Sequence, residues 1–184
     1  VDLAKPGTLP KVDPKVLAVY TEPTELLPTD GIVRETAQTI VKGVRGGPHE
    51  QARAIYEWVV ENTFRDPKTR GCGVGDIKTM LETKNLGGKC ADLNALFVGL
   101  CRAVGIPARD VYGVRVATSQ LGFKSLGKSG DITKAQHCRA EVYLEGYGWV
   151  PVDPGDVRKV VLEEQPGLTL NDDVVKRART FLFG

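Results

Sequence analysis

Cys90 stands where a loop becomes a helix, in the stretch GGKCADLNALFVGLCRAVGIPAR that runs from Gly87 to Arg109. The first N–H groups of a helix lack intrahelical acceptors and carry partial positive charge, which stabilises a thiolate. Lys89 adds charge of the same sign, and Gly88 removes side-chain bulk so that a substrate carbonyl can come close. The pattern therefore predicts a nucleophilic cysteine of lowered pKa, with its own N–H facing the oxyanion.

The alternative is that Cys90 is a small apolar residue at the start of a core helix. Cys101 is the useful contrast, because it lies inside a run of Ala, Leu, Phe and Val and is expected to pack in the core. Cys138 is expected in the core as well, on the apolar face of a strand. Together with Cys72 these residues form no C-x-x-C pair, so we predict no zinc site, no disulfide framework, no metal and no cofactor.

A nucleophilic cysteine needs a base, and the base needs a group that orients it. His137 opens a predicted strand, His137–Leu144, whose successive side chains point to opposite faces. One face is apolar, and the other carries four polar or amphipathic residues: His137, Arg139, Glu141 and Tyr143. His137 is therefore the candidate base, with a purely structural histidine as the alternative. His49, in the first turn of a surface helix, is a weaker candidate.

Asp153 ends the next predicted strand, Trp149–Asp153, ahead of Pro154, which cannot continue a ladder. It lies on the face of His137 only if odd residues pair with odd residues across the hairpin. A three-residue loop, 145–147, or a bulge produces that register, whereas a four-residue loop turns Asp153 away. Asp153 is the candidate orienting group, and the alternative is that it only forms the turn before the proline.

Two longer stretches together resemble the transglutaminase-like superfamily of papain-type cysteine enzymes: GGKCADLNALFVGLCRAVGIPARDVYGV and HCRAEVYLEGYGWVPVDP. In that family a helix-leading Cys, a strand His and a strand-terminal Asp form the catalytic triad, in this chain order. The resemblance implies that Cys90 is the nucleophile, His137 the base and Asp153 the orienting group. It covers roughly Pro48 to Pro154 and implies an α+β fold with a papain-like core, in which the Cys helix packs on an antiparallel sheet carrying His and Asp.

One departure from the family pattern concerns Arg139, which stands where many members have a tryptophan two residues after the histidine. A guanidinium there would bind an anionic substrate group, or would simply pair with Glu141. Arg139, Gly88 and Lys89 are the candidate substrate-binding residues. The motifs do not place the second oxyanion donor, which we expect in the loop Thr63–Gly75.

The elements that position these residues follow from periodicity and turn residues. We expect helices over 32–44, 48–62, 76–84 and from 90 to about 105, strands over 109–117, 137–144 and 149–153, and a last helix capped by Asn171 or Asp172. Helices that precede strands favour the α+β class. The proline-rich residues 1–31 are predicted to form an extended N-terminal arm with a short helical turn at 15–20. Residues 32–184 are predicted to form a single domain whose core motif region is 48–154.

The connection from Thr118 to Gln136 is long for a compact domain, and such connections are often functional. It carries Lys124, Lys128 and Lys134, which predict that it forms part of the rim of the cleft. The alternative is a solvated surface loop.

Length, charge and hydropathy limit the classes of protein to which the chain can belong. A chain of 184 residues suits one domain with a hydrophobic core, and 25 Lys and Arg nearly balance 23 Asp and Glu, so no nucleic-acid partner is predicted. No stretch approaches the roughly 18 continuous apolar residues of a membrane span. Because the chain begins at Val1, we expect either that an upstream segment was cleaved or that the sequence was trimmed, and the apolar run at its end suggests that the natural chain continues. The compartment, cytoplasmic or exported, and the oligomeric state stay open.

These residues together predict acyl transfer on amide bonds through a Cys-His-Asp triad and a thioester intermediate. If water resolves the thioester the enzyme is a protease or amidase, and if an amine does so it is a cross-linking transglutaminase. We favour the hydrolase, because no calcium-binding loop is recognisable, and we expect a peptide or protein substrate. The alternative from another class is a non-catalytic peptide-binding module on the same fold.

Overall fold

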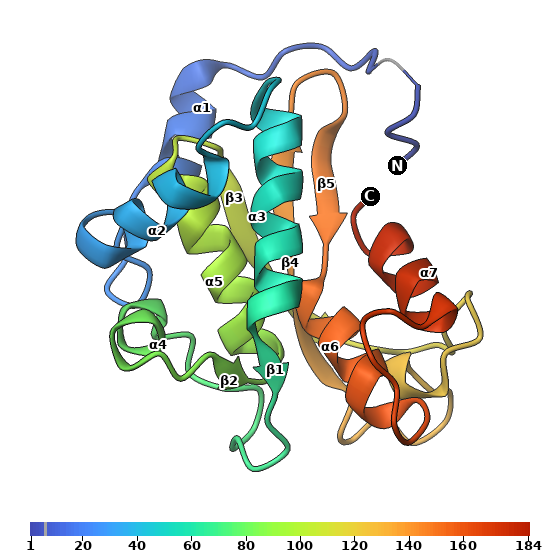
Figure 1. Ribbon diagram of the computed structural model, residues 1–184. Helices are drawn as coiled ribbons and strands as arrows, with labels where there is room; N and C mark the ends of the chain where they lie inside the picture. Colours follow the sequence, from blue (N-terminus) through green and yellow to red (C-terminus); the bar gives the residue numbers. More distant parts are fainter. Residues whose placement is uncertain (6) are drawn as a thin grey trace.

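Helix α5 (Cys90–Ala103) lies at the centre of a computed structural model that describes residues 1–5 and 7–184 (Figure 1). Every side chain from the start of this helix to Cys101 is buried, and all but two of these residues, Asp92 and Asn94, are apolar or small. It packs against β4, the central strand of an antiparallel sheet. The strands lie in the order β3 (Ala108–Val114), β4 (Gln136–Leu144) and β5 (Gly148–Val152). This arrangement confirms the predicted α+β class.

The hairpin between β4 and β5 decides which side chains share a face. Tyr143 pairs with Trp149, and residues 145–147 form the loop. Gly146, at the centre of that loop, has a φ of 81°, which glycine adopts without strain. Odd residues therefore pair with odd residues, and the predicted register is confirmed. It places the end of β5 on the same face of the sheet as His137.

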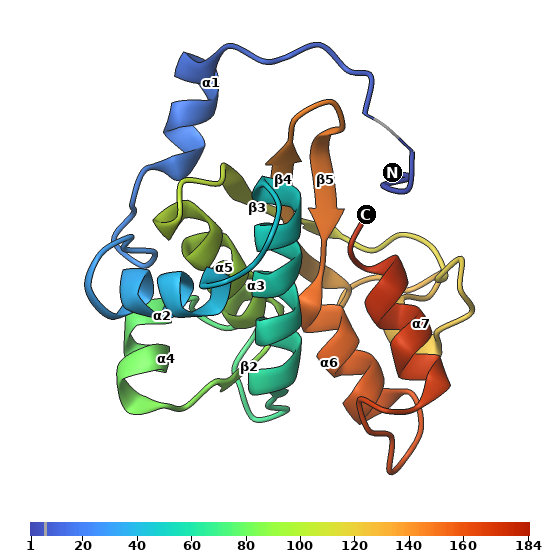
Figure 2. The same cartoon turned by 45° about the horizontal axis from the view of Figure 1, so that its top comes forward.

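Further helices surround α5 and the sheet (Figures 1 and 2). Several begin or end at the predicted residues, such as α3, which starts at a proline and ends at Asn62. Their bounds are α1 (Pro14–Ala18), α2 (Gly31–Val41), α3 (Pro48–Asn62), α4 (Ile77–Thr83), α6 (Pro154–Glu163) and α7 (Asp173–Phe181), with short 3₁₀ helices η1 (Val19–Thr21) and η2 (Lys124–Leu126).

Residues 12–20 contact the face of the sheet that α5 does not cover, beside the loop between β4 and β5. The Val12 N–H donates to the Tyr143 hydroxyl at 3.2 Å, and Tyr20 packs edge-on against Trp149 with ring centroids 4.7 Å apart. The two ends of the chain lie side by side (Figures 1 and 2), with the terminal ammonium group donating to the carbonyl of the last residue at 2.9 Å.

Helix α6 is the main element that the periodicity analysis missed. It begins directly after Asp153, whose side chain caps it by accepting from the Asp156 N–H at 2.9 Å, and Pro154 takes the first helical position. An N-cap aspartate followed by proline is a recognised helix start. From the sequence we interpret the same residues as the end of a strand followed by a proline that stops the ladder, and this interpretation does not predict the helix.

Two smaller differences concern strand ends. β1 (Phe64–Arg65) pairs in parallel with β2 (Gly87–Gly88), inside segments that we predicted as loops. Strands of two residues are too short to show any periodic pattern. β3 ends at Val114 rather than at residue 117, because its partner strand begins at Gln136 and offers no further ladder.

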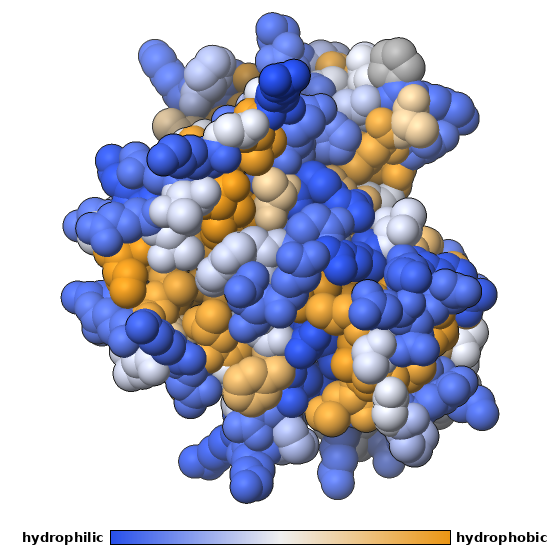
Figure 3. Space-filling model, viewed as in Figure 1, coloured by the Kyte–Doolittle hydropathy of each residue, from blue (hydrophilic) through white to orange (hydrophobic). Residues whose placement is uncertain are grey.

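The hydrophobic core lies between α5, the sheet and the surrounding helices. Its largest fully buried side chains include Tyr56, Phe97, Ile55, Ile77, Leu93 and Leu96. Hydrophilic side chains cover most of the face seen in Figure 3, with apolar residues gathered in separate patches. Among residues 1–5 and 7–184, no helix is both long and apolar enough to cross a bilayer.

Replacing Cys101 with alanine is expected to lower the free energy of unfolding by about 1–2 kcal/mol and to leave the reactivity of Cys90 unchanged. Cys101 is fully buried in the main core, as predicted, so the change removes packing contacts without touching the candidate site. Urea unfolding and the rate of Cys90 alkylation are the two measurements. A loss of alkylation at unchanged stability would contradict the core assignment.

Candidate active site

The start of α5 is held in place by the side chain of Asp92. Its Oδ2 accepts from the Lys89 N–H at 2.9 Å, and its Oδ1 accepts from the N–H groups of Val74 and Gly75, also at 2.9 Å. The carboxylate thus joins the first turn of the helix to the loop that precedes α4. The Cys72 carbonyl adds a second link by accepting from the Ala91 N–H at 2.8 Å. These bonds fix the backbone around Cys90.

Gly88 serves this arrangement in a way that the sequence did not indicate. A Cβ atom built on Gly88 would lie 2.5 Å from the Cβ and Oδ2 of Asp92, much closer than real contacts allow. The missing side chain therefore makes room for the carboxylate. Space for a substrate carbonyl, the predicted reason for the glycine, is not what the packing shows.

Replacing Gly88 with alanine is expected to displace Asp92, to lower the free energy of unfolding by about 1–3 kcal/mol and to slow alkylation of Cys90. Thermal or urea unfolding and iodoacetamide kinetics measure the two effects. Gly113→Ala is the matched control, because a Cβ atom there meets nothing within 4 Å. Equal stability of the two variants would show that the carboxylate does not need this space.

His137 and Asp153 meet at the end of the hairpin. The His137 Nε2 atom lies 2.6 Å from the Asp153 Oδ2 atom, and both side chains are largely buried. The second carboxylate oxygen, Oδ1, accepts from the Asn94 side-chain amide at 3.1 Å and from the Asp156 N–H at 2.9 Å. Asp153 is thereby fixed from three sides, and its negative charge faces the imidazole ring.

Cys90 lies on the other side of the imidazole. It packs against Cys138 in a small cluster, and its side chain lines the same cleft as that of His137. The thiol and the imidazole are close enough for each to shift the pKa of the other. Because Nε2 of the ring faces Asp153, the nitrogen left for the sulfur is Nδ1. The structure thus brings together the three residues that the sequence predicted as nucleophile, base and orienting group.

The electrostatics of this group favour an ion pair. The hydrogen bond with Cys138, opposed by burial, and the contact with His137 lower the pKa of Cys90 to about 3. Burial opposes a charged imidazole, but the charge and hydrogen bond of Asp153, with the bond to Cys90, raise the pKa of His137 to about 10. Between these two values the pair exists as thiolate and imidazolium, the form that a thiol nucleophile requires.

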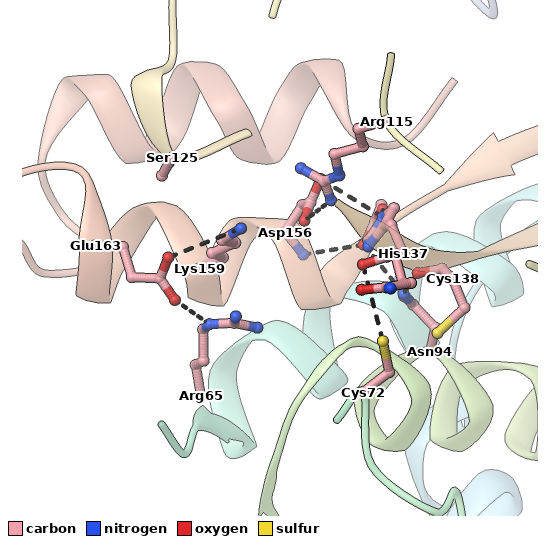
Figure 4. A network of polar contacts seen from close by, with 12 residues as sticks. Arg65, Cys72, Asn94, Arg115, Ser125, His137, Cys138, Asp156, Lys159 and Glu163 are labelled. Carbon is pink, nitrogen blue, oxygen red and sulfur yellow. Dashed lines mark hydrogen bonds and ion pairs between the residues drawn. The ribbon is translucent and has the colours of Figure 1, made fainter. Parts of the chain in front are cut away.

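Asn94, Arg115 and Asp156 belong to the site although the sequence reasoning did not select them (Figure 4). The fully buried Asn94 amide joins Asp153 to the Cys138 carbonyl, to which it donates at 2.8 Å. Arg115 binds both oxygens of Asp156, at 2.5 and 2.7 Å. Two features of the sequence could have pointed to these residues: Asn94 is an asparagine near the start of a helix, and Asp156 is the second aspartate of the helix start D-P-G-D.

Three of these groups could offer ligand atoms to a cation, because His137, Asp153 and Asp156 have donor atoms within 4.8 Å of one another. Asp156 Oδ2 lies 3.8 Å from His137 Nε2. However, Arg115 already binds both oxygens of Asp156, and an adjacent guanidinium repels a metal ion. The donor set therefore fits a hydrogen-bonded triad better than a metal site.

Two further thiols lie against Cys90. Cys138 is fully buried, as predicted, and its side chain packs against Cys90 in a small cluster apart from the main core. Cys72, predicted only as a loop residue, packs in the same small cluster, and its sulfur lies 3.8 Å from the Gln136 carbonyl oxygen. The loop 63–75, where we expect a second oxyanion donor, therefore does reach the candidate nucleophile.

The remaining candidate residues lie at the edge of the site or outside it. Arg139 is exposed and pairs with Glu141 at 3.0 Å, which is the second of the two alternatives foreseen for it. Lys89 caps α5 but is not among the side chains that line the cleft at Cys90. His49 stacks on Phe183 in the first turn of α3, away from the site, as predicted.

A cleft of about 200 Å³ opens at the sulfur of Cys90. Its walls come from the N-terminal end of α5, from α6, and from the connection between β3 and β4. Lys124, Lys128 and Lys134 all line it, together with His137. The connection therefore forms part of the cleft rim, as predicted.

An antiparallel sheet that carries a His–Asp pair, with a buried helix that presents a cysteine to it, defines an α+β protein of the papain-like type. The chain belongs to the transglutaminase-like superfamily, whose family model matches residues 34–154.

The chain is also similar to individual proteins. An uncharacterized protein of Haemophilus influenzae is 41% identical in an alignment of 174 residues that covers 90% of this chain and 46% of that protein, so the chain spans about half of its relative. A candidate cysteine protease from Cytophaga hutchinsonii superposes with a TM-score of 0.58 at 22% identity, covering 88% of this chain and 49% of the other. The periplasmic domain of TgpA from Pseudomonas aeruginosa, bound to ethylmercury, gives a TM-score of 0.59 at 22% identity, covering 84% and 53%. At this identity the solved structures establish the shared fold.

Proposed function

We propose that this chain is a cysteine enzyme that transfers the acyl group of an amide bond to water, a protease or amidase, through Cys90, His137 and Asp153. The observation that carries the proposal is the position of His137. Its Nε2 atom lies 2.6 Å from Asp153, and its ring lines the same cleft as the Cys90 thiol. An imidazole held between a thiol and a buried carboxylate is the arrangement that activates a cysteine nucleophile.

In the first half of the reaction the Cys90 thiolate attacks the carbonyl carbon of the amide. The resulting oxyanion is stabilised by the Cys90 N–H, which is free of an intrahelical acceptor because it begins α5. His137 gives its proton to the amide nitrogen, the C–N bond breaks, and the amine leaves. The acyl group remains on the sulfur as a thioester.

In the second half a water molecule resolves the thioester. The neutral His137 takes a proton from the water while its oxygen adds to the carbonyl carbon, and the C–S bond then breaks. The carboxylic product leaves, and the thiolate–imidazolium pair is restored. Asp153 keeps the ring in one orientation and stabilises its positive charge through both halves.

The charge of the cleft favours water over an amine as the acceptor. Lys124, Lys128 and Lys134 line the cleft, and their positive charge repels the ammonium group of a lysine acceptor. Water carries no charge and is not excluded in this way. Hydrolysis is therefore favoured over cross-linking.

Trapping of the acyl-enzyme tests the proposal. After brief incubation with peptide p-nitroanilides and an acid quench, we expect mass spectrometry to find the acyl group on the peptide that contains Cys90. We expect the released product to be a carboxylic acid, even when a primary amine is present. An amide product would replace the hydrolase by a transferase, and an acyl group on another residue, or on none, would contradict the role of Cys90.

A further inference from the structure

The cleft at Cys90 is strongly cationic. Of the charged side chains that line it, six are lysine or arginine and one is a carboxylate, Asp156. The six cations are Arg65, Arg115, Lys124, Lys128, Lys134 and Lys159. This imbalance is local, because the whole chain carries a formal net charge of only +2.

Carboxylates of the protein neutralise part of this charge. Asp156 binds Arg115 through both of its oxygens. Glu163 is shared between Arg65, which hydrogen-bonds to it directly, and Lys159, whose Nζ atom lies 3.7 Å away (Figure 4). These two carboxylates neutralise two of the three positive charges of Arg65, Arg115 and Lys159, and one positive charge is left.

The three lysines of the 118–136 connection are less compensated, although Lys124 lies near the carboxylate of Glu164 and helps to lower its pKa. Lys124, Lys128 and Lys134 are exposed, and none of them forms an ion pair within the described part of the chain. Exposed charges that are not paired attract an anion that enters the cleft, and salt in the solution screens this attraction. They lie at the mouth of the cavity that contains the reactive sulfur.

The connection is anchored, so the lysines have a defined place. Glu164 of α6's C-terminal end accepts from the N–H groups of Lys124 and Ser125, at 3.0 and 2.9 Å, and from the Ser125 hydroxyl at 2.6 Å. Phe123 is buried in the core, and the Ala135 carbonyl accepts from the Arg115 N–H at 2.9 Å. These contacts hold both ends of the segment against the rest of the protein, and the segment forms a wall of the cleft.

We propose that the substrate is an acidic peptide, with a carboxylate group beside the amide bond that Cys90 attacks. The inference rests on the proposed function, and it names the class of substrate. With a volume of about 200 Å³ the cavity is smaller than the roughly 300–1,000 Å³ of most ligand pockets, so it suits the reacting amide and one adjoining side chain. Lysine ammonium groups at its rim would bind that side chain through charge-assisted hydrogen bonds.

Charged and neutral alkylating agents test the cationic cleft without any turnover. Iodoacetate carries a carboxylate and iodoacetamide does not, so the ratio of their rates at Cys90, each normalised to free cysteine, measures the attraction. We expect a normalised ratio of about 10 in favour of iodoacetate at low ionic strength, falling towards 1 at high salt. Mass mapping of the Cys90 peptide separates its reaction from that of Cys72.

The variant K124Q/K128Q/K134Q is expected to lose most of this preference. The matched control is K15Q/K42Q/K78Q, which removes the same charge from exposed lysines that do not line the cleft. Equal loss in the control would mean that net charge alone produces the effect. A ratio near 1 in the wild-type protein would overturn the acidic-substrate inference while fast alkylation by both reagents still supported the activated thiol. Slow alkylation by both reagents would instead count against the proposed function.

Peptide p-nitroanilides supply the second arm of the test. Two sets carry an acidic or a neutral side chain before the scissile amide, and a third set, of plain peptides, has a C-terminal residue with a free α-carboxylate after it. We expect kcat/KM to be at least about tenfold higher for the acidic side chains than for the neutral set, and the lysine triple variant to remove the difference. Preference for the free α-carboxylate would assign the cleft to chain ends, and preference for neutral peptides would contradict the inference.

Discussion

Replacing Cys90 with alanine is expected to reduce amide hydrolysis by roughly 10⁴-fold or more, because no other group in the cleft can form the thioester. The variant should fold normally, since the change removes one sulfur atom from the start of a helix whose first turn is held by Asp92. Turnover of a peptide p-nitroanilide measures the first effect, and circular dichroism with urea unfolding measures the second.

Cys72→Ala is the informative companion to this variant. Cys72 packs beside Cys90 and is the more exposed of the two thiols, so it could be mistaken for the nucleophile. The His137 imidazole contacts Asp153 and helps to lower the pKa of Cys90, and we therefore expect the Cys72 variant to keep most of its turnover. Loss of activity in the Cys72 variant, with activity kept in Cys90→Ala, would reverse the assignment.

Replacing Asp153 with asparagine is expected to lower kcat by about 10³–10⁴-fold at nearly unchanged stability. The oxygen that accepts from Asn94 and from the Asp156 N–H must stay an acceptor, so the new amide group has to place its NH₂ towards His137. That NH₂ donates to Nε2 and forces the ring proton onto Nδ1. The ring can then no longer accept the proton of Cys90.

The same substitution at a second helix start provides the control for Asp153→Asn. Asp172 stands at the N-cap of α7, accepts from Thr169 on the surface and does not line the cleft at Cys90. Asp172→Asn is expected to change neither turnover nor the pH profile. If Asp153→Asn were as active as Asp172→Asn, Asp153 would be only a cap for α6 and its orienting role would be wrong.

The local features of the site could be predicted from the sequence because each depends on nearby residues. The helix that begins at Cys90 follows from its glycines and its apolar run, and the strand that begins at His137 follows from alternation. The register that unites His137 with Asp153 was predictable only as a condition on the loop 145–147. The three-residue loop depends on a turn with Gly146 at its centre. The same sequence was equally consistent with a four-residue loop.

Other parts of the site depend on contacts between distant segments, which no local pattern shows. Asn94 reaches Asp153 across 59 positions of the chain, and Arg115 reaches Asp156 across 41. The approach of Cys72 to Cys90 depends on how the loop before α4 folds back, because the residues between them carry no periodicity that fixes it. Helix α6 was missed for a different reason: its start signal overlaps the end of a strand.

The most direct test of the account is the ionisation of one sulfur atom. The ultraviolet absorbance of thiolate can be titrated in the wild-type protein and in Cys90→Ala, and the difference between the two curves belongs to Cys90. With pKa values of about 3 for Cys90 and about 10 for His137, we expect one thiolate to be present at pH 6 and to disappear only as the pH falls towards 3. A difference signal that appears only near pH 8.5, as for an ordinary thiol, would show that His137 does not activate Cys90.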